Sequence, residues 1–151
     1  MVDLDGVLAD TTHRQHHIER RAGRPPGRDG WRQFFAAAGA DPVIPATRAL
    51  LRWLPEEVTI VLLSARPGWI FDTTVGGLEQ HEVPWHLLVL RGEGPVGPAA
   101  AFKRDVVRTL ADAGFRIEAC LDDDPAVVAA YRADGVPVLP VAMEVPGPRA
   151  R

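Results

Sequence analysis

The sequence predicts an α/β fold of three layers, in which a parallel sheet is covered by helices on both faces. Short apolar runs, several of them rich in β-branched residues, alternate along the chain with segments of helical pattern. Strands that alternate with helices form parallel sheets with both faces covered. The length of 151 residues suits one domain and is too short for two. We therefore expect one domain over residues 1–144 and a disordered tail over residues 145–151.

Each strand is expected at one of the short apolar runs, and each helix in a segment between two of them. The expected strands are Met1–Leu4, Val58–Leu63, Leu87–Leu90, Ile117–Leu121 and Val136–Val141. The expected helices are Ala46–Leu54, Ile70–Glu82, Ala99–Ala113 and Ala126–Asp134. Gly114 and Gly135 follow the last two helices as stop signals. Asp124 and Pro125 open the last helix in the usual order of a capping residue followed by proline.

The segment between the first two strands is longer than a parallel connection requires. About 60 residues separate Asp3 from Ser64, whereas a single crossover helix needs far fewer. We expect residues 11–45 to form a small cap, with helices near Thr12–Ala22 and Gly30–Ala38. A small cap leaves the crevice open, which suits a bulky substrate.

The cap segment combines positive charge with aromatic residues. Residues 11–32 carry six arginines, which are Arg14, Arg20, Arg21, Arg24, Arg28 and Arg32, against two acidic residues, for a net charge of +4. Trp31, Phe34 and Phe35 lie beside them. Basic residues next to aromatic residues bind nucleotides and single strands. The alternative is a solvated helix face with the aromatic residues packed on the core, because their spacing is also that of a helical core face.

The composition excludes several classes of protein. A net charge of −3 argues against wholesale coating of nucleic acid, although not against a local basic patch. No apolar run approaches the roughly 20 residues of a membrane helix, so no membrane partner is expected. The N-terminus also lacks a signal-peptide pattern. Cys120, the only cysteine, lies in an apolar run and fits a buried residue of a cytoplasmic protein.

Chemically active side chains gather at the expected carboxyl ends of the strands, where parallel sheets bind their ligands. In chain order these ends carry Asp3, Asp5 and Gly6, then Ser64 and Arg66, then Arg91 with Lys103 on the following helix, and finally Asp122, Asp123 and Asp124. So many carboxylates in one crevice would repel one another unless a cation joined them. Because every candidate ligand atom at these strand ends is an oxygen, Mg²⁺ fits better than zinc. Lys103 is also the only lysine in a chain with 16 arginines. Its presence indicates a position that the planar guanidinium of arginine does not suit.

Asp3 and Asp5 have a spacing suited to phosphoryl transfer. Residues i and i+2 point to the same side while the chain is extended. One carboxylate can attack phosphorus while the other exchanges a proton with the leaving group and then with water. Gly6 permits the sharp turn that follows. Together with Ser64 and Lys103, this pattern indicates a phosphatase that forms an aspartyl phosphate.

The sequence resembles the haloacid dehalogenase (HAD) superfamily, whose members have a three-layer Rossmann-like fold. Its four motifs are matched in order by Asp3-Leu4-Asp5-Gly6-Val7-Leu8, Ser64, Lys103 and Asp122-Asp123. The resemblance implies that Asp3 is the nucleophile and Asp5 the acid and base. It also implies that Mg²⁺ is held by Asp3, the Asp5 carbonyl and either Asp122 or Asp123. The second aspartate of the first motif accompanies phosphatases and phosphomutases, whereas haloacid dehalogenases lack it.

A closer resemblance is to the phosphatase domain of polynucleotide kinase-phosphatases, which remove 3′-phosphates from nucleic-acid ends. Ser64-Ala65-Arg66-Pro67 is similar to their S/T-G-R-x stretch, Arg14 falls where they carry an arginine, and Leu90-Arg91 resembles their L-x-x-R strand end. The resemblance implies that Arg14, Arg66 and Arg91 bind a phosphorylated nucleotide or nucleic-acid end. Relatives have several apolar residues before the first motif, whereas only Met1 and Val2 precede Asp3 here, which leaves room for a true start upstream.

Two alternatives stay open at this point. A phosphatase of small metabolites would use the same residues and the same mechanism. A protein of another class, either a receiver-like module or a non-catalytic binder of phosphorylated ligands, would also combine an acidic pair, a hydroxyl and a lysine. In receiver domains the acidic pair ends the first strand, whereas here the adjacent pair Asp122-Asp123 comes fourth in chain order.

Overall fold

A parallel sheet forms the centre of the protein in the computed structural model, which describes residues 1–19, 25–92 and 97–142. The strands form two pairs. β1 (Val61–Pro67) runs parallel to β2 (Leu87–Arg91), and β3 (Cys120–Asp122) runs parallel to β4 (Val138–Pro140). The register places Val61 opposite Leu87 in the first pair and Cys120 opposite Val138 in the second.

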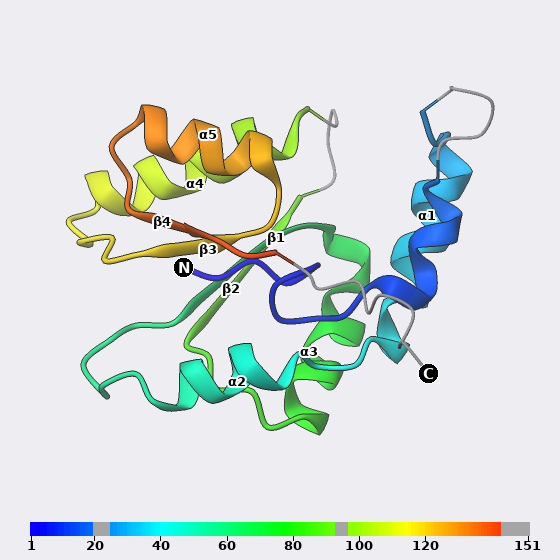
Figure 1. Cartoon of the computed structure of the whole chain (residues 1–151), viewed down its shortest axis with the longest axis horizontal. Coiled ribbons are helices and arrows are strands. Elements are labelled where there is room, and N and C mark those ends of the chain that lie inside the picture. Colours follow the sequence, from blue (N-terminus) through cyan, green and yellow to red (C-terminus); the bar gives the residue numbers. More distant parts are fainter. Residues whose placement is uncertain (20–24, 93–96, 143–151) are drawn as a thin grey trace, which may run out of the picture.

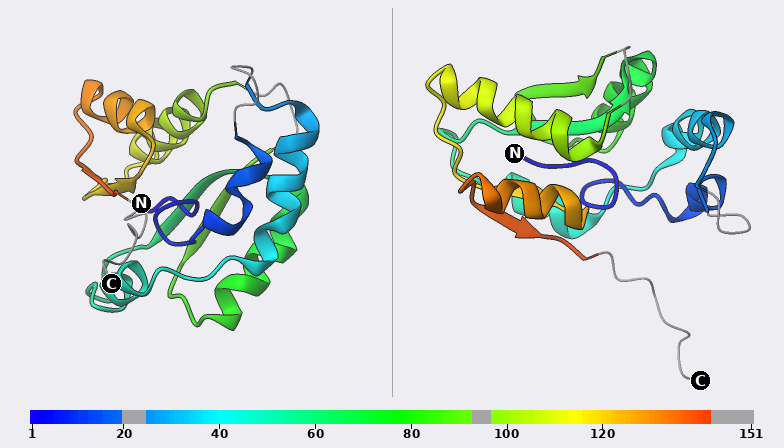
Figure 2. Two further views of the ribbon diagram at one scale, coloured as in Figure 1. Left: turned by 45° about the vertical axis from the view of Figure 1, so that its right-hand side comes forward. Right: turned by 90° about the horizontal axis from the view of Figure 1, so that it is seen from above.

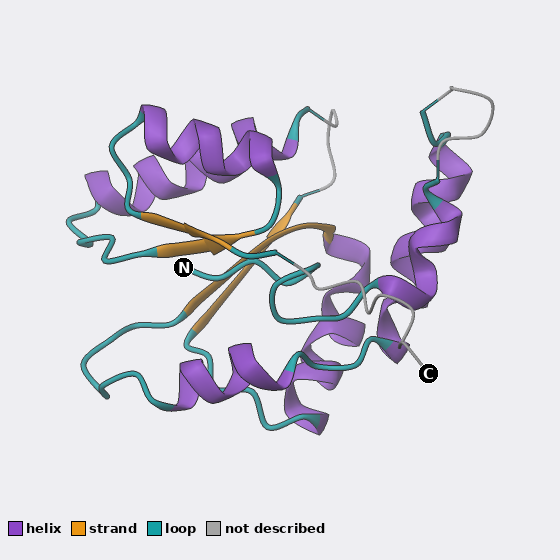
Figure 3. Ribbon diagram, in the orientation of Figure 1, coloured by secondary structure: helices purple, strands orange, loops and turns teal. Residues whose placement is uncertain are grey.

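The N-terminal residues join the two pairs into one sheet. Val2 forms parallel bridges to Leu62 of β1 and to Leu121 of β3. The amide of Val2 donates to the carbonyl of Val61 at 2.8 Å, and the amide of Asp3 donates to the carbonyl of Leu121 at 3.0 Å. The order across the sheet is therefore β2, β1, the N-terminal segment, β3 and β4. Figure 3 shows this segment as a loop between the two pairs of strands.

The strand expected over Met1–Leu4 is thus reduced to bridges at a single residue. The chain leaves the sheet at Leu4, whose carbonyl accepts hydrogen bonds from the amides of Leu8 and Ala9 at 2.9 and 2.7 Å. This turn passes through Gly6 at φ +84°, a left-handed conformation that glycine adopts without steric cost. The turn therefore takes the chain out of the sheet directly after Asp3.

Helices cover both faces of the sheet (Figure 1). α4 (Ala99–Asp112) and α5 (Pro125–Ala133) pack against each other on one face, and α2 (Pro45–Arg52) and α3 (Phe71–Gln80) lie on the other. The short 3-10 helix η3 (Gly68–Ile70) leads from β1 into α3. Each α-helix of these layers lies where the sequence predicts one, and the three-layer α/β arrangement is the predicted one.

Local sequence explains the two ends of α5. The side chain of Asp124 accepts a hydrogen bond from the amide of Ala126 at 2.8 Å, and Pro125 takes the first helical position. The helix is followed by Gly135 at φ +71°, as expected for a glycine stop. A side-chain cap of this kind contributes about 1 kcal/mol, so the chain that follows Asp122 is well anchored.

Hydrophobic clusters on both sides hold the sheet in place. One cluster contains Leu4, Leu8, Leu51, Leu62 and Leu78, and the other contains Val107, Cys120, Val127 and Tyr131. The side chains of Leu62 and Val127 have no exposed surface, and each is worth about 1.5–3 kcal/mol of burial. Cys120 is buried, as its apolar surroundings in the sequence predict. The strand ends therefore rest on a rigid base.

The cap segment contains the 3-10 helices η1 (Thr12–His17) and η2 (Ala37–Ala40), with α1 (Arg28–Ala36) between them. Figures 1 and 2 show η1 and α1 side by side and away from the helices of the main layers. The helix expected over Thr12–Ala22 ends at His17 as a 3-10 helix with no side-chain cap at Thr11. Residues 20–24 and the expected tail over residues 145–151 lie outside the described residues.

The helix expected over Gly30–Ala38 starts earlier, at Arg28, because the backbone of Gly27 is extended and serves as its N-cap. Across the described ranges, no helix combines the length and the apolar character that crossing a bilayer requires.

Candidate active site

The carboxyl ends of the central strands bring four of the expected residues together. Asp3 follows Val2 in the middle of the sheet, Ser64 lies on β1 and Asp122 ends β3. Lys103 reaches them from the first turns of α4. All four side chains are buried, as expected for residues held between the sheet and its covering helix.

Lys103 connects two of the carboxylates. Its Nζ lies 3.0 Å from Asp3 Oδ1 and 2.6 Å from Asp122 Oδ2. Burial opposes the charge of Lys103, but Asp3 and Asp122 outweigh burial and hold its pKa above the usual value. The lysine is therefore a fixed positive charge between the end of the N-terminal segment and the end of β3.

Asp3, Asp122 and Asp123 form a cluster that suits a divalent cation. One carboxylate oxygen from each lies within 4.8 Å of the others. Burial raises the pKa of Asp3 to about 8, and burial together with Asp122 raises that of Asp123 to about 6. The single charge of Lys103 thus leaves these carboxylates under-neutralised. An all-oxygen donor set of this kind fits Mg²⁺.

Gly6 lies directly against this cluster. A Cβ atom at Gly6 would stand 2.1 Å from Asp123 Oδ2 and 2.6 Å from Asp123 Cγ. Any side chain at this position would therefore displace the Asp123 carboxylate. The glycine of the first motif is needed both for its positive φ and for the space that it leaves to Asp123.

Asp5 is held by two arginines rather than by the cluster. Arg66 Nη2 lies 2.7 Å from Asp5 Oδ1, and Arg14 Nη2 donates to the same oxygen. Burial opposes the ionisation of Asp5, but Arg66 and Arg14 outweigh it and lower the pKa of Asp5. The carboxylate is thereby ionised and fixed in orientation at the edge of the cluster.

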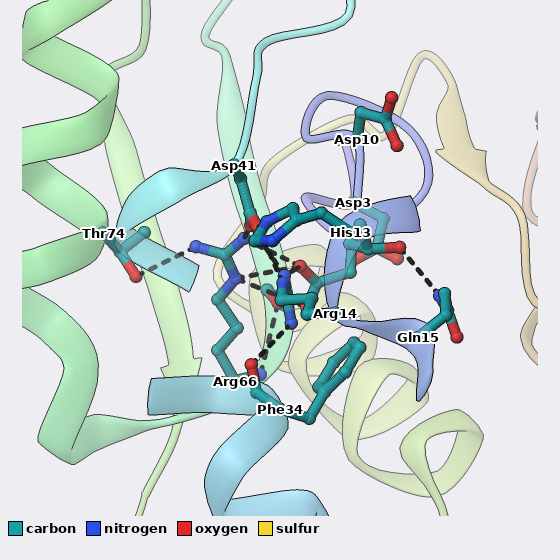
Figure 4. Close-up of polar contacts among 12 residues, drawn as sticks. Asp3, Asp10, His13, Arg14, Gln15, Phe34, Asp41, Arg66 and Thr74 are labelled. Atoms are coloured by element: carbon teal, nitrogen blue, oxygen red, sulfur yellow. Dashed lines mark hydrogen bonds and ion pairs between the residues drawn. The ribbon is translucent and has the colours of Figure 1, made fainter. Parts of the chain in front are cut away.

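Asp41, at the end of the cap segment, completes this ion-pair network (Figure 4). Its carboxylate accepts from Arg14 Nε at 2.7 Å, from Arg14 Nη2 at 2.6 Å and from Arg66 Nη2 at 2.6 Å. Arg14 has no exposed surface, and its guanidinium stacks 3.9 Å above the ring of Phe34. Asp41 was not among the residues predicted from the sequence, because its role depends on the burial of Arg14 and Arg66, which no sequence pattern indicates.

The three arginines expected at the substrate lie in two places. Arg14 and Arg66 form ion pairs with Asp5, and their contact with substrate stays a prediction. Arg91 lies at the end of β2, where its Nη1 donates to the carbonyl of Gly97 at 3.0 Å and its guanidinium faces the ring of Phe102 at 5.3 Å. The described structure does not bring Arg91 to the cluster, and its contact with substrate stays a prediction.

A cleft of about 380 Å³ opens over the cluster. Its lining includes Asp3, Asp5, Ser64, Lys103 and Asp123 near the strand ends, and Thr11, Gln15, Trp31, Phe34 and Phe35 from the cap segment. The volume is in the range of small-molecule sites. A ligand that fills this cleft would contact both the carboxylates and aromatic rings of the cap segment.

Comparisons with known proteins agree with this arrangement. A family model described as the polynucleotide kinase PNKP phosphatase domain matches residues 1–144. A chain of the Pnkp1/Rnl/Hen1 RNA repair complex is 21% identical, with a TM-score of 0.72 over 93% of this chain and 41% of that one. A chain of a Pnkp1/Rnl/Hen1 complex is also 21% identical, with a TM-score of 0.74 over 93% and 44%. No curated protein matches significantly.

This chain spans less than half the length of the two structural neighbours, and at 21% identity their likeness concerns the fold. The family match, in contrast, covers nearly all of the residues that build the sheet, the cluster and the cap. The chain is a HAD-type phosphatase and belongs to the family of polynucleotide kinase-phosphatase (PNKP) phosphatase domains.

Proposed function

We propose that this protein hydrolyses phosphomonoesters at nucleotide or nucleic-acid 3′-ends, with Mg²⁺ as cofactor and an aspartyl phosphate on Asp3 as intermediate. The observation that carries the proposal is the position of Asp3, which lies 3.0 Å from Lys103 and within 4.8 Å of oxygens of Asp122 and Asp123. A carboxylate held beside a buried ammonium and two further carboxylates is suited to receive a phosphoryl group next to a cation.

In the first step, an oxygen of Asp3 attacks phosphorus and the bond between phosphorus and the ester oxygen breaks. The electron pair of that bond stays on the leaving oxygen, which takes a proton from Asp5. Ser64, buried beside Asp3 on β1, and Lys103 are placed to hold the phosphoryl oxygens. The contacts of Asp5 with Arg66 and Arg14 favour its ionised form, so Asp5 must gain a proton before this step.

In the second step, Asp5 is ionised and accepts a proton from water, whose oxygen attacks the phosphorus of the aspartyl phosphate. The bond between phosphorus and the Asp3 oxygen breaks, inorganic phosphate leaves and the Asp3 carboxylate is restored. The two arginines keep Asp5 in the ionised form that this step requires and fix its orientation, and by lowering its pKa they also make it a weaker base.

The carboxylates of Asp3, Asp122 and Asp123 would hold the metal, and the Asp5 carbonyl is the further ligand that the family resemblance implies. When bound, Mg²⁺ neutralises the charge that builds up on the transferring phosphoryl group. The site fits this ion because the cluster offers only oxygen donors and carries more negative charge than Lys103 balances.

Two observations support a nucleic-acid end as the substrate. The matching family is that of phosphatase domains from polynucleotide kinases, and one structural neighbour belongs to an RNA repair complex. The cleft also extends from the carboxylates to aromatic residues of the cap segment, so it has room for more than a phosphate group.

Phosphate release from four substrates tests the proposal. These are a 3′-phosphorylated oligonucleotide, the same oligonucleotide with a 5′-phosphate, p-nitrophenyl phosphate and glucose 6-phosphate, each with Mg²⁺ or with EDTA. We expect Mg²⁺-dependent release with a preference for the 3′-phosphate, abolished by Asp3→Asn and unaffected by the matched change Asp112→Asn at the exposed end of α4. Preference for glucose 6-phosphate would point to a metabolite phosphatase, and absence of turnover on all four to a non-catalytic binder.

A further inference from the structure

The aromatic residues of α1 divide into two groups that the sequence could not separate. Phe34 is buried under the guanidinium of Arg14, so it belongs to the core of the cap segment. Trp31 keeps 41% of its surface exposed, although all three aromatic residues of α1 line the cleft above the carboxylate cluster. The expectation of core packing therefore applies to Phe34, and Trp31 is the ring that keeps surface free for a ligand.

Trp31 is held in a defined orientation by its two neighbours. Its ring meets that of Phe34 edge to face, at a centroid distance of 5.7 Å and an interplanar angle of 83°. It also stacks beside Phe35 at 5.8 Å and 25°. Contacts of both kinds are favourable for aromatic rings. These two contacts hold the Trp31 ring in place, so the part of it that stays exposed needs no reordering before a planar ligand stacks on it.

We propose that Trp31 is the stacking platform for the base of the nucleotide whose 3′-phosphate reaches Asp3, an inference that rests on the proposed function. One cleft of about 380 Å³ contains both groups, so a single nucleotide occupies it with its phosphate at Lys103 and its base at Trp31. Arg28, exposed and one helical turn before Trp31, adds positive charge for the adjoining phosphate of a longer strand. Every base presents a π-face, so the site takes any of the bases.

The decisive experiment compares two substrates that differ only in the base. Thymidine 3′-monophosphate and the corresponding base-free deoxyribose 3-phosphate are assayed with the full chain and Mg²⁺. We expect Trp31→Ala to raise KM for the thymidine ester on the order of 5- to 150-fold, the range for loss of one stacked base, and to leave the base-free ester unchanged. Trp31→Phe should keep most of the affinity.

Trp53→Ala is the matched control, because Trp53 is 85% exposed at the end of α2 and does not line the cleft. We expect it to change KM for neither ester. An equal loss on both esters with Trp31→Ala would overturn the proposal, because it would show a structural role. Equal KM values for the two esters in the wild type would overturn it as well.

Binding without turnover separates this inference from the proposed function. Thymidine 3′-monophosphate is titrated into the metal-free protein while tryptophan fluorescence is recorded. We expect quenching in the wild type and in Trp53→Phe, and its loss in Trp31→Phe. Quenching at Trp31 without hydrolysis in the presence of Mg²⁺ would reject the proposed function and keep the stacking site. Hydrolysis of thymidine 3′-monophosphate without quenching would do the reverse.

Discussion

Replacing Asp41 by asparagine would test the ion-pair network behind Asp5. In the native protein, two guanidinium groups, those of Arg14 and Arg66, are balanced by two carboxylates, those of Asp5 and Asp41. The side chains of Arg14, Arg66 and Asp41 are 0%, 4% and 5% exposed. Asp41→Asn preserves the shape of the side chain but leaves one positive charge of the network without a partner.

The structure indicates the size of the effect. Removing one partner of a buried ion pair costs about 3–5 kcal/mol, because the remaining charge stays out of water. The asparagine oxygen still accepts one hydrogen bond and Asp5 still attracts both arginines, so we expect the lower end, about 3 kcal/mol. For a domain of this size that loss lowers Tm by about 6–12 °C. We also expect at least a tenfold loss of kcat, because Arg14 and Arg66 set the orientation of Asp5.

Urea denaturation and steady-state phosphatase assays, both with Mg²⁺ present, measure these two effects. Asp112→Asn, which removes an exposed aspartate from the end of α4, is the control and should change stability by less than about 0.5 kcal/mol. A loss of stability below about 1 kcal/mol for Asp41→Asn would refute the claim that Asp41 balances the buried arginines. Unchanged kcat would refute its effect on Asp5.

Three further predictions concern the carboxylate cluster. Lys103→Arg keeps the charge but should lower kcat on the order of 100-fold. The planar guanidinium of arginine cannot repeat the contacts of one Nζ atom, which lies 3.0 Å from Asp3 and 2.6 Å from Asp122. Less than a threefold change in steady-state assays would contradict this prediction. Gly6→Ala should abolish the rise in Tm that Mg²⁺ produces, because its Cβ displaces Asp123 and its φ is positive; an unchanged Mg²⁺-induced rise would argue against the site. Calorimetric titration of Mg²⁺ in buffers of different ionisation enthalpy should show proton release at pH 7 that disappears at pH 9. The reason is that the pKa of Asp3 is raised to about 8, and a carboxylate must lose its proton to bind a metal ion. Equal proton release at both pH values would contradict the assignment of Asp3 as a ligand.

The parts of this site that the sequence predicts are those that depend on strand order. Asp3, Ser64 and Asp122 each follow a run of buried apolar residues, and the ends of neighbouring parallel strands meet at one edge. Lys103 lies in the first turns of the helix that follows a strand end, and so it reaches the same edge. Hydrophobic periodicity records these positions directly, so their meeting at one edge of the sheet could be predicted without coordinates.

Other features depend on contacts that leave no periodic signal. Asp41 reaches Arg14 and Arg66 across 27 and 25 positions of sequence, and nothing in its neighbourhood distinguishes it from a solvated loop residue. The stacking of the buried Arg14 guanidinium on Phe34 could not be predicted from the sequence either, and the contact of Arg14 with substrate stays a prediction. The length of the first strand was also misjudged, because the turn at Gly6 takes the chain out of the sheet at once.

The N-terminal segment has a consequence for how activity depends on folding. It joins the two pairs of strands, β1 with β2 and β3 with β4, because Val2 forms bridges to both pairs. Asp3 is the next residue and pairs with Lys103 of α4, a helix that contacts both α5 and β1, and Lys103 in turn pairs with Asp122 at the end of β3. Separation of the two pairs of strands at this segment would disturb the position of the Asp3 carboxylate, even with each pair still structured. Under the proposed mechanism, enzymatic activity would therefore depend on the integrity of the whole sheet, and a partly opened molecule would be inactive.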